Sequence, residues 1–231
     1  MPRSWPGLLS STSVSGSTSA APGEGIRSVP GLVIGIAVSI YWIRVLQMVL
    51  RARREAGHDA NFVPREKLGR LLRYVWIPVV TLWIALPLFA FFRRKHKAIF
   101  QPLYHEPVVA WAAAGVGVIA LIATFICWRK MGTSWRMGIN PDDKTRLIST
   151  GPYAYVRHPI YALSSLLMLA TMTILPSRTM LVVGVVHLLL LQWEARREEQ
   201  YLVGVHGNEY VSYAGRTGRF LPRFFGRSIA S

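Results

Sequence analysis

The feature that most constrains this chain is a series of long apolar runs that carry almost no charge. The clearest of them, Val108–Trp128, has 21 residues and no charged side chain. As an α-helix it would be about 31 Å long, which matches the hydrocarbon core of a bilayer. A run placed in lipid has to be helical, because an open strand edge finds no hydrogen-bond partner there.

Four further apolar stretches flank this run: Gly31–Leu50, Tyr74–Phe92, Ile160–Leu175 and Thr179–Trp193. The break Pro176-Ser177-Arg178 is short enough to be a tight turn between two antiparallel helices. No helix breaker follows Trp193, so the last helix is predicted to continue through residue 205 into water. The sequence therefore predicts an all-α integral membrane bundle of about five transmembrane helices, the last two forming a tight hairpin.

Basic residues separate the apolar runs and indicate an orientation. The chain has 27 Lys and Arg against 11 Asp and Glu, a formal charge of +16. Because these residues sit in clusters between apolar runs, they do not indicate a soluble nucleic-acid-binding domain, and the single Cys127 excludes a disulfide scaffold. Nineteen basic residues fall on one side and 7 on the other, and Arg44 lies inside the first apolar run. This asymmetry favours an outside N-terminus and a cytoplasmic C-terminal segment. The Arg-rich composition and the compactness of the chain indicate a bacterial inner membrane. The basic cluster at 93–97 is the exception to the pattern.

The composition divides the chain into three parts. Residues 1–29 are rich in Ser, Gly, Pro and Thr, which predicts a flexible tail. Residues 30–128 hold the first three transmembrane helices. Residues 129–231 hold a loop, the helical hairpin and a C-terminal segment, and we expect the chemistry there.

The run Arg157-His158-Pro159 opens the first helix of the hairpin. Pro159 suits the first helical turn, whose N–H groups and positive dipole end favour an anion. Tyr153 and Tyr161 add aromatic faces and hydroxyl donors close by. Two interpretations remain at this point: a pocket for a small molecule with an anionic group and an aromatic ring, or an ordinary belt of Tyr and Arg at the lipid headgroups.

Carboxylates gather where the last apolar run ends. Glu194 and Glu198 share a helix face, and Glu194 also lies three residues before Arg197. They either form ion pairs on a solvated helix or contact a ligand. His187, inside the last run, is a functional candidate or a neutral side chain bonded to a neighbouring helix. No set of His, Cys and carboxylate residues has the spacing of a metal site.

Several motifs over about residues 125–225 together resemble the superfamily of isoprenylcysteine carboxyl and phospholipid methyltransferases. They are Met131-Gly132-x-Ser134-Trp135-Arg136-x-Gly138, Gly151-x-Tyr153-x-x-x-Arg157-His158-Pro159-x-Tyr161, Glu198-Glu199-x-x-Leu202, Gly207-x-x-Tyr210-x-x-Tyr213 and Arg219-x-Leu221-Pro222.

This resemblance implies an S-adenosylmethionine-dependent membrane methyltransferase with a lipophilic acceptor and no metal. Carried over by position, it implies that the cofactor contacts Thr145, Arg146, Leu147, Ile148, Tyr153, His158, Pro159, Ile160, Tyr161 and Glu198. His158 and the helix start would hold the carboxylate or polar end of the cofactor. Glu198 would accept hydrogen bonds from the ribose hydroxyls or the amino group.

One position departs from the resemblance and bears on the acceptor. The isoprenylcysteine enzymes carry an Arg, which meets the substrate carboxylate, where this chain has Glu194. We expect Glu194 and Arg197 to act in catalysis: Glu194 as a proton acceptor for an amine, and Arg197, with Arg196 as the alternative, as a replacement for the missing cation, although neither matches its position. The acceptor is thus a prenylated cysteine carboxylate, a phospholipid amine or a similar lipid.

Two other functions remain open from the sequence. A nicotinamide-dependent reductase of the sterol or steroid type has similar C-terminal hairpins, although the Arg-His-Pro-x-Tyr run and the Glu pair fit the methyltransferases better. A membrane scaffold or transporter would bind no cofactor, and a transporter would need polar residues at mid-membrane, where the runs offer His187 and small hydroxyls.

Overall fold

The structure is a computed structural model that describes residues 24–56, 67–92, 106–132, 135 and 147–223. Within these ranges it is all-helical, as the apolar runs predict, and contains no strand beyond one isolated bridge. The elements are α1 (Glu24–Ala56), α2 (Lys67–Phe92), α3 (Pro107–Met131), the short 3₁₀ helix η2 (Gly151–Ala154), α4 (Pro159–Ile174), α5 (Arg178–His206) and α6 (Asn208–Arg216).

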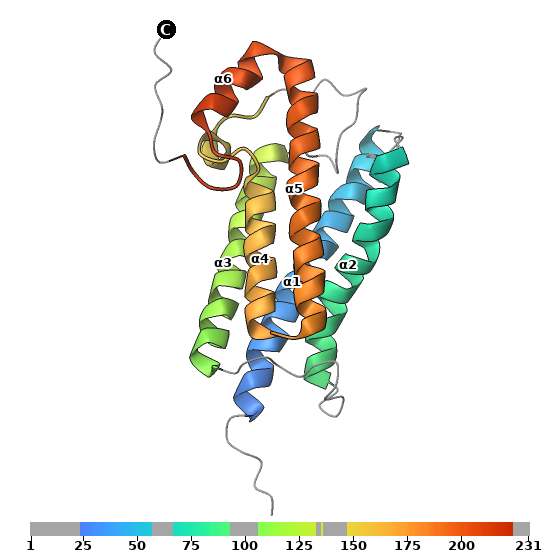
Figure 1. Ribbon diagram of the computed structural model, residues 1–231, viewed down its shortest axis with the longest axis vertical. Coiled ribbons are helices and arrows are strands. Elements are labelled where there is room, and N and C mark those ends of the chain that lie inside the picture. Colours follow the sequence, from blue (N-terminus) through green and yellow to red (C-terminus); the bar gives the residue numbers. More distant parts are fainter. Residues whose placement is uncertain (1–23, 57–66, 93–105, 133–134, 136–146, 224–231) are drawn as a thin grey trace, which may run out of the picture.

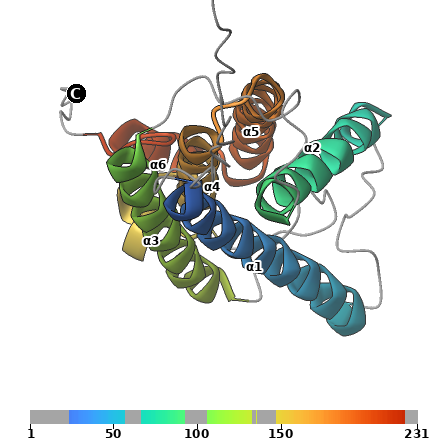
Figure 2. The same ribbon diagram turned by 90° about the horizontal axis from the view of Figure 1, so that it is seen from below.

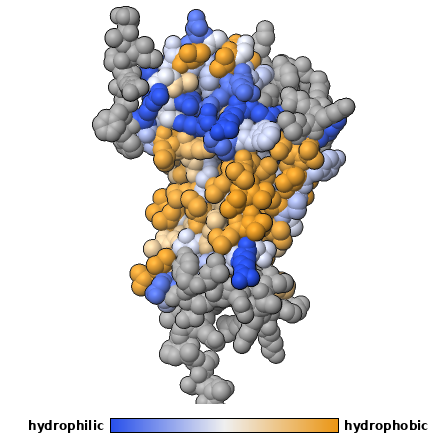
Figure 3. Space-filling model, in the orientation of Figure 1, coloured by the Kyte–Doolittle hydropathy of each residue, from blue (hydrophilic) through white to orange (hydrophobic). Residues whose placement is uncertain are grey.

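Four helices are long and apolar enough to cross a membrane: Val29–Arg54, Gly69–Phe91, Pro107–Met131 and Arg178–His206. The fifth expected span, α4, is apolar but has 16 residues, or about 24 Å. It is short because it begins at Pro159 and ends before Pro176, which disfavours helix in the residue preceding it. On the face shown in Figure 3, an apolar band crosses the middle of the molecule between more hydrophilic surface. The protein is an integral membrane helical bundle.

The predicted hairpin is confirmed. Ser177 caps α5 by accepting a hydrogen bond from the backbone N–H of Met180 at 3.2 Å. α5 then runs for 29 residues to His206, past the end of its apolar part at Trp193. Gly184 lets the two helices approach closely, because a Cβ there would lie 2.2 Å from the sulfur of Met172.

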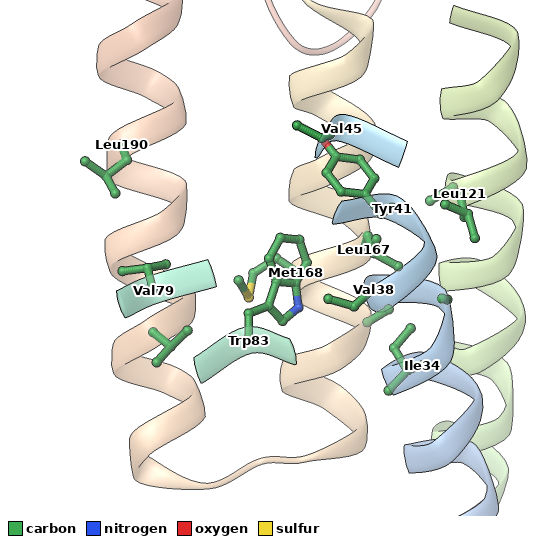
Figure 4. Close-up of a cluster of buried hydrophobic side chains, with 14 of the residues drawn as sticks. Ile34, Val38, Tyr41, Val45, Val79, Trp83, Leu121, Leu167, Met168 and Leu190 are labelled. Carbon is green, nitrogen blue, oxygen red and sulfur yellow. The ribbon is translucent and has the colours of Figure 1, made fainter. Parts of the chain in front are cut away.

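α4 occupies the centre of the bundle (Figures 1 and 2). It packs against α1, α3 and α5, whereas α2 packs against α1 and α5. The core between them is aliphatic and aromatic and surrounds Trp83, which is fully buried (Figure 4). The N–H of Trp83 donates to the hydroxyl of Thr171 on α4 at 3.0 Å. His187 on α5 lies 3.2 Å from the hydroxyl of Ser164 on α4, which is the helix-to-helix bond expected of a structural histidine.

The chain after α5 folds back over the start of α4. Gly207, at φ +53°, turns the chain into α6. Two short segments, 155–158 and 217–219, then pair through backbone hydrogen bonds, and we call this pairing the C-terminal clamp. The N–H of Arg157 donates to the carbonyl of Gly218 at 2.8 Å, and that of His158 to the carbonyl of Arg219 at 3.1 Å. The clamp lies at the end of the bundle shared by α6 and η2 (Figure 1).

Some predictions fall outside the described residues. These are the first 23 residues of the expected tail at 1–29 and the basic cluster at 93–97. The division into three parts stays a prediction.

Candidate active site

Two carboxylates near the end of α5 meet the N-terminal end of α4. The phenol of Tyr161 donates a hydrogen bond to Glu198. The Nδ1 atom of His158 lies 3.5 Å from the same carboxylate. The rings of His158 and Tyr161 are stacked, with centroids 5.4 Å apart and an interplanar angle of 2°. Three residues that the resemblance implies for the cofactor therefore form one cluster.

The second carboxylate, Glu199, connects the cluster to the C-terminal clamp. It accepts hydrogen bonds from Nε of Arg157 at 2.9 Å and from Nε of Arg219 at 3.0 Å. The guanidinium of Arg157 also donates to the backbone carbonyls of Ala214 and Thr217. Sequence reasoning missed this role of Glu199, although Arg157, Glu199 and Arg219 all fall within the quoted motifs.

His158 sits between the two carboxylates and is buried. Its Nε2 atom lies 3.4 Å from Glu199 but has no aligned hydrogen-bond partner among the described residues. Burial disfavours the imidazolium, but hydrogen bonding and charge attraction from Glu198 and Glu199 outweigh burial and raise the pKa of His158 above its ordinary value of 6.5. The histidine therefore holds its proton to higher pH than an exposed one.

A cavity of about 70 Å³ lies beside this cluster, and each of the helices α1 to α5 contributes to its wall. Its lining includes Tyr161 of the cluster and two further predicted residues, Ile160 and Glu194. The remaining lining residues are Tyr41, Trp42, Val45, Arg73, Trp76, Trp128, Trp135, Ser164 and Leu191. The cavity thus joins the polar cluster at the start of α4 to the apolar interior of the bundle.

Glu194 and Arg197 form an ion pair, with one guanidinium nitrogen 3.1 and 3.2 Å from the two carboxylate oxygens. Glu194 is buried in the cavity wall, with a residue exposure of 7%. The structure thus places Arg197 against Glu194, so the acidic side chain in the cavity wall already has a cation beside it.

The other predicted residues surround the cluster. Pro159 begins α4, as expected, with His158 as its N-cap. Tyr153 in η2 is buried, and its carbonyl accepts a hydrogen bond from the phenol of Tyr213 at 2.7 Å. Leu147 and Ile148 are half-buried. Thr145 and Arg146 lie outside the described residues.

The donor set at this end of the bundle fits a polar ligand. His158 Nε2 and the phenol oxygens of Tyr153 and Tyr210 are buried and have no hydrogen-bond partner among the described residues. Burial raises the pKa of Tyr153, so its phenol stays protonated and remains a donor. These atoms, with the acceptor oxygens of Glu198, match the mixed donors and acceptors that S-adenosylmethionine offers. No group of three or more His, Cys, Asp or Glu residues within the described ranges could hold a metal ion.

Fold and site together define a helical membrane protein whose polar site lies where a C-terminal hairpin meets the segment after it. Comparison with known proteins gives the family. The isoprenylcysteine carboxyl methyltransferase (ICMT) family matches residues 113–204, from within α3 through most of α5. The chain belongs to this family. It is therefore related to methyltransferases of the membrane, whose members use S-adenosylmethionine.

Two relatives are similar over a larger part of the chain. The cobalt-zinc-cadmium resistance protein CzcN of Cupriavidus metallidurans is 30% identical over 165 residues, covering 71% of this chain and 67% of that protein. The nickel-cobalt-cadmium resistance protein NccN of Alcaligenes xylosoxydans xylosoxydans is 25% identical over 149 residues, covering 59% of this chain and 69% of that protein. Neither name specifies a methyl acceptor.

Proposed function

We propose that this protein is an S-adenosylmethionine-dependent methyltransferase of the membrane that acts on a lipophilic acceptor. The observation that carries the proposal is the cluster of His158, Tyr161 and Glu198, which borders a cavity between five helices. The cluster supplies the polar contacts of a soluble cofactor. The cavity supplies an apolar space in which a lipid would react.

The cluster suits the zwitterionic amino-acid end of the cofactor. A protonated His158 and the N-terminal end of α4 favour a carboxylate. Glu198 has four acceptor sites and uses one of them for Tyr161, so it can also accept from an ammonium or a ribose hydroxyl. Glu199 and the C-terminal clamp hold His158 in place and keep water from the cluster.

The cofactor supplies an activated methyl group on a sulfonium, so the residues of this chain need to align and enclose the reactants. Tyr161 belongs to both the cluster and the cavity wall, and it therefore marks where the two substrates meet. The helices α1 to α5 surround the cavity and exclude water from the space next to Tyr161. Glu194 stands in the cavity wall beside it, in reach of the head group of an acceptor, and Arg197 is paired with Glu194.

Binding of S-adenosylmethionine to the purified protein in nanodiscs tests the proposal. We expect saturable binding by isothermal titration calorimetry, and no binding at millimolar cofactor would reject the function. His158→Ala and Glu198→Ala should each weaken binding by roughly tenfold or more, since each removes a charge-assisted contact. Glu198→Gln keeps the shape of the side chain and removes its charge. It replaces Glu198→Ala as the test of this contact if the alanine variant does not fold.

Glu209→Ala is the matched control for these variants. Glu209 is an exposed carboxylate in the first turn of α6, beyond the end of α5. Its removal should leave the affinity unchanged. An equal loss in Glu209→Ala would mean that the general negative charge of the C-terminal region, rather than the cluster, governs binding.

The reductase and scaffold alternatives give different outcomes in the same sample. Thermal protection by NADPH instead of S-adenosylmethionine would favour the reductase. Protection by neither compound would favour a scaffold or transporter.

We further propose that the C-terminal clamp and the cluster face the cytoplasm in a bacterial inner membrane. The excess of basic residues, 19 against 7, on the side that holds both supports the orientation, and the Arg-rich composition supports the kind of membrane. Fusion of a reporter that is active only in the cytoplasm to the C-terminus tests this orientation. An inactive reporter on a well-expressed fusion would reverse it.

A further inference from the structure

Helix α2 carries a proline in its interior, Pro78, between two parts that pack differently. Proline has no N–H, so the helical bond to the carbonyl of Tyr74 is missing, and the proline ring crowds that carbonyl. Less than one turn later, the hydroxyl of Thr81 donates to the carbonyl of Ile77 at 2.9 Å, and side-chain bonds of this kind also bend helices. Sharp changes of helix direction concentrate at such positions. Pro78 is therefore the point at which α2 can bend.

The part of α2 that follows the proline is anchored in the bundle. Trp83 is fully buried, donates to Thr171 on α4 at 3.0 Å, and has its ring centre 4.6 Å from that of His187 on α5. On the α1 side, a Cβ added to Gly35 would lie 2.8 Å from the side chain of Leu88, so the two helices are in close contact there. Packing against three neighbouring helices fixes this part of α2.

The part of α2 that precedes the proline, residues 69–77, is held more loosely. Only Leu72 has a buried side chain within this range. Tyr74 is 69% exposed and Ile77 is 50% exposed. A segment with few buried contacts costs little free energy to displace, whereas the part with Trp83 does not move without breaking the core. The two parts of one helix therefore differ in their freedom to move.

This loosely held part stands between two spaces. The cavity beside the cluster and an apolar groove of about 210 Å³ along α1 and α2 share four lining residues. Trp42 and Val45 come from α1, and Arg73 and Trp76 come from the part of α2 before the proline. We call the second space the α1–α2 groove. A displacement of residues 69–77 would remove half of the shared wall and join the cavity to the groove.

Electrostatic contacts favour the observed position of this part. Arg73 is attracted by the carboxylate of Glu194 on α5. Its guanidinium carbon also lies 5.9 Å from the centre of the Trp76 ring, which is a cation–π distance. An attraction between side chains on two helices can break and form again while both helices stay intact. The contact between α2 and α5 thus stabilises a closed position without locking it.

We propose that residues 69–77 form a gate that turns about Pro78 and opens the cavity to the α1–α2 groove and the surrounding lipid. In the closed position, Arg73 and Trp76 separate the two spaces. In the open position, both side chains move away with the gate. The gate lies outside residues 113–204, so the family match does not cover it. Passage of the methyl acceptor through the gate rests on the proposed function, whereas the movement itself does not.

Distances between spin labels test the movement of the full chain in nanodiscs. The single cysteine is buried, so Cys127→Ser provides the background. One label is attached at Ile119→Cys, an exposed position of α3, which lies across the bundle from α2 (Figure 2). The other is attached at Tyr74→Cys before the proline or at Leu82→Cys after it, both exposed. Double electron–electron resonance should give a broad distance distribution for the first pair and a narrow one for the second. Equal widths would overturn the proposal.

Pro78→Ala locates the hinge, because it restores the missing N–H and removes the crowding ring. The distribution for Tyr74→Cys should then become about as narrow as that for Leu82→Cys. Pro87→Ala is the matched control, since Pro87 also lies inside α2 but is buried in the anchored part. A distribution that stays broad in Pro78→Ala, or that narrows equally in Pro87→Ala, would overturn the hinge. The comparison of the two label positions does not depend on either variant.

Alkylation by N-ethylmaleimide tests whether the movement opens the cavity. Val45 is 7% exposed and lines both spaces, whereas Leu46 is 52% exposed and lines only the groove. Pro78→Ala should slow alkylation of Val45→Cys severalfold and leave that of Leu46→Cys unchanged. An unchanged rate at Val45→Cys would overturn the role of the gate in access to the cavity.

Calorimetry with S-adenosylmethionine on the same samples separates this proposal from the proposed function. Equal distance distributions with intact cofactor binding would remove only the gate. A gate that moves in a protein without cofactor binding would remove only the methyltransferase.

Discussion

The two walls of the cavity are built differently. The wall from α4, α5 and the C-terminal clamp holds carboxylates that already have hydrogen-bond partners. Glu198 accepts a hydrogen bond from Tyr161, and Glu199 accepts from Arg157 and Arg219. The wall from α1 and α2 holds aromatic side chains and one cation, Arg73, with indole donors that have no hydrogen-bond partner among the described residues.

This difference separates two tasks. A wall whose charges are fixed in advance suits a cofactor that is the same in every turnover, because preorganised contacts lose little freedom on binding. A wall of rings and unsatisfied donors suits an acceptor whose head completes the hydrogen bonding. The family match covers most of the first wall and leaves α1 and α2 outside it. Changes in either wall should therefore have separable effects.

Of the changes that should affect one wall and not the other, Glu199→Gln should have the largest effect. It removes a carboxylate that is 14% exposed and leaves Arg157, 13% exposed, without its ion pair. Loss of one partner from a buried ion pair costs about 3 kcal/mol or more, so the clamp should loosen and cofactor affinity should fall. Thermal unfolding and calorimetry measure both effects. Glu209→Gln is the control, and unchanged cofactor affinity in a folded Glu199→Gln would contradict the role of the clamp in the site.

Gly218→Ala should disrupt the C-terminal clamp through a clash with the backbone. A Cβ at this position would lie 1.7 Å from the carbonyl oxygen of Leu221, so the chain has to shift. We expect a loss of about 2 kcal/mol in stability and weaker cofactor binding. Gly215→Ala is the matched control, because a Cβ there meets nothing within 4 Å. Cofactor affinity equal to that of the unmodified protein would mean that the clamp is not part of the site.

Thr171→Val should loosen the second wall instead. The substitution leaves the N–H of Trp83, on α2, buried without its acceptor, at a cost of about 1.5 kcal/mol. Thermal unfolding should occur at lower temperature with little change in cofactor affinity. Thr173→Val removes a hydroxyl from the exposed face of the same helix, which also donates to a carbonyl four residues earlier, and should be neutral. A large loss of cofactor affinity in Thr171→Val would contradict the separation of the two walls.

A change of pH should have the smallest effect on the stability of the folded protein. The carboxylates Glu198 and Glu199 raise the pKa of His158, so the charged histidine stabilises the folded state. That contribution is complete below the unfolded pKa of 6.5 and is lost as pH rises through the higher folded pKa. Stability should therefore decline above the ordinary titration range of histidine, by less than in the variants above. Denaturant unfolding across pH measures it, and His158→Gln should flatten that part of the profile.

The sequence predicted those parts of the fold that depend on local pattern. Uncharged runs predicted the helices, Pro176 and Ser177 predicted the turn of the hairpin, and Pro159 predicted the start of α4. The shortness of α4 also follows from the sequence, since the apolar run Ile160–Leu175 has 16 residues and so has the helix. The two prolines, Pro159 and Pro176, fix its ends through their backbone geometry.

The candidate site was predictable only where residues lie close in the sequence. The run from Tyr153 to Tyr161 and the Glu pair could be chosen as candidates because each is a local cluster. The contacts of Glu199 and the cavity position of Arg73 could not, since the former join residues 20 and 42 positions apart and the latter depends on how α2 packs. Arg73 looked like one more basic residue at a membrane surface.

The C-terminal clamp also bears on how the molecule is made. Arg157 is held by residues 57 and 60 positions later in the chain, and Glu199 is held by Arg219, 20 positions after Glu199. During synthesis all five long helices can enter the membrane before these partners have left the ribosome. The nascent protein therefore passes through a stage in which the bundle is inserted but His158 and Glu198 are still uncovered. The cover over His158 and Glu198 forms only after residue 219 has emerged, so a chain that ends within α6 would insert as a bundle with these residues uncovered.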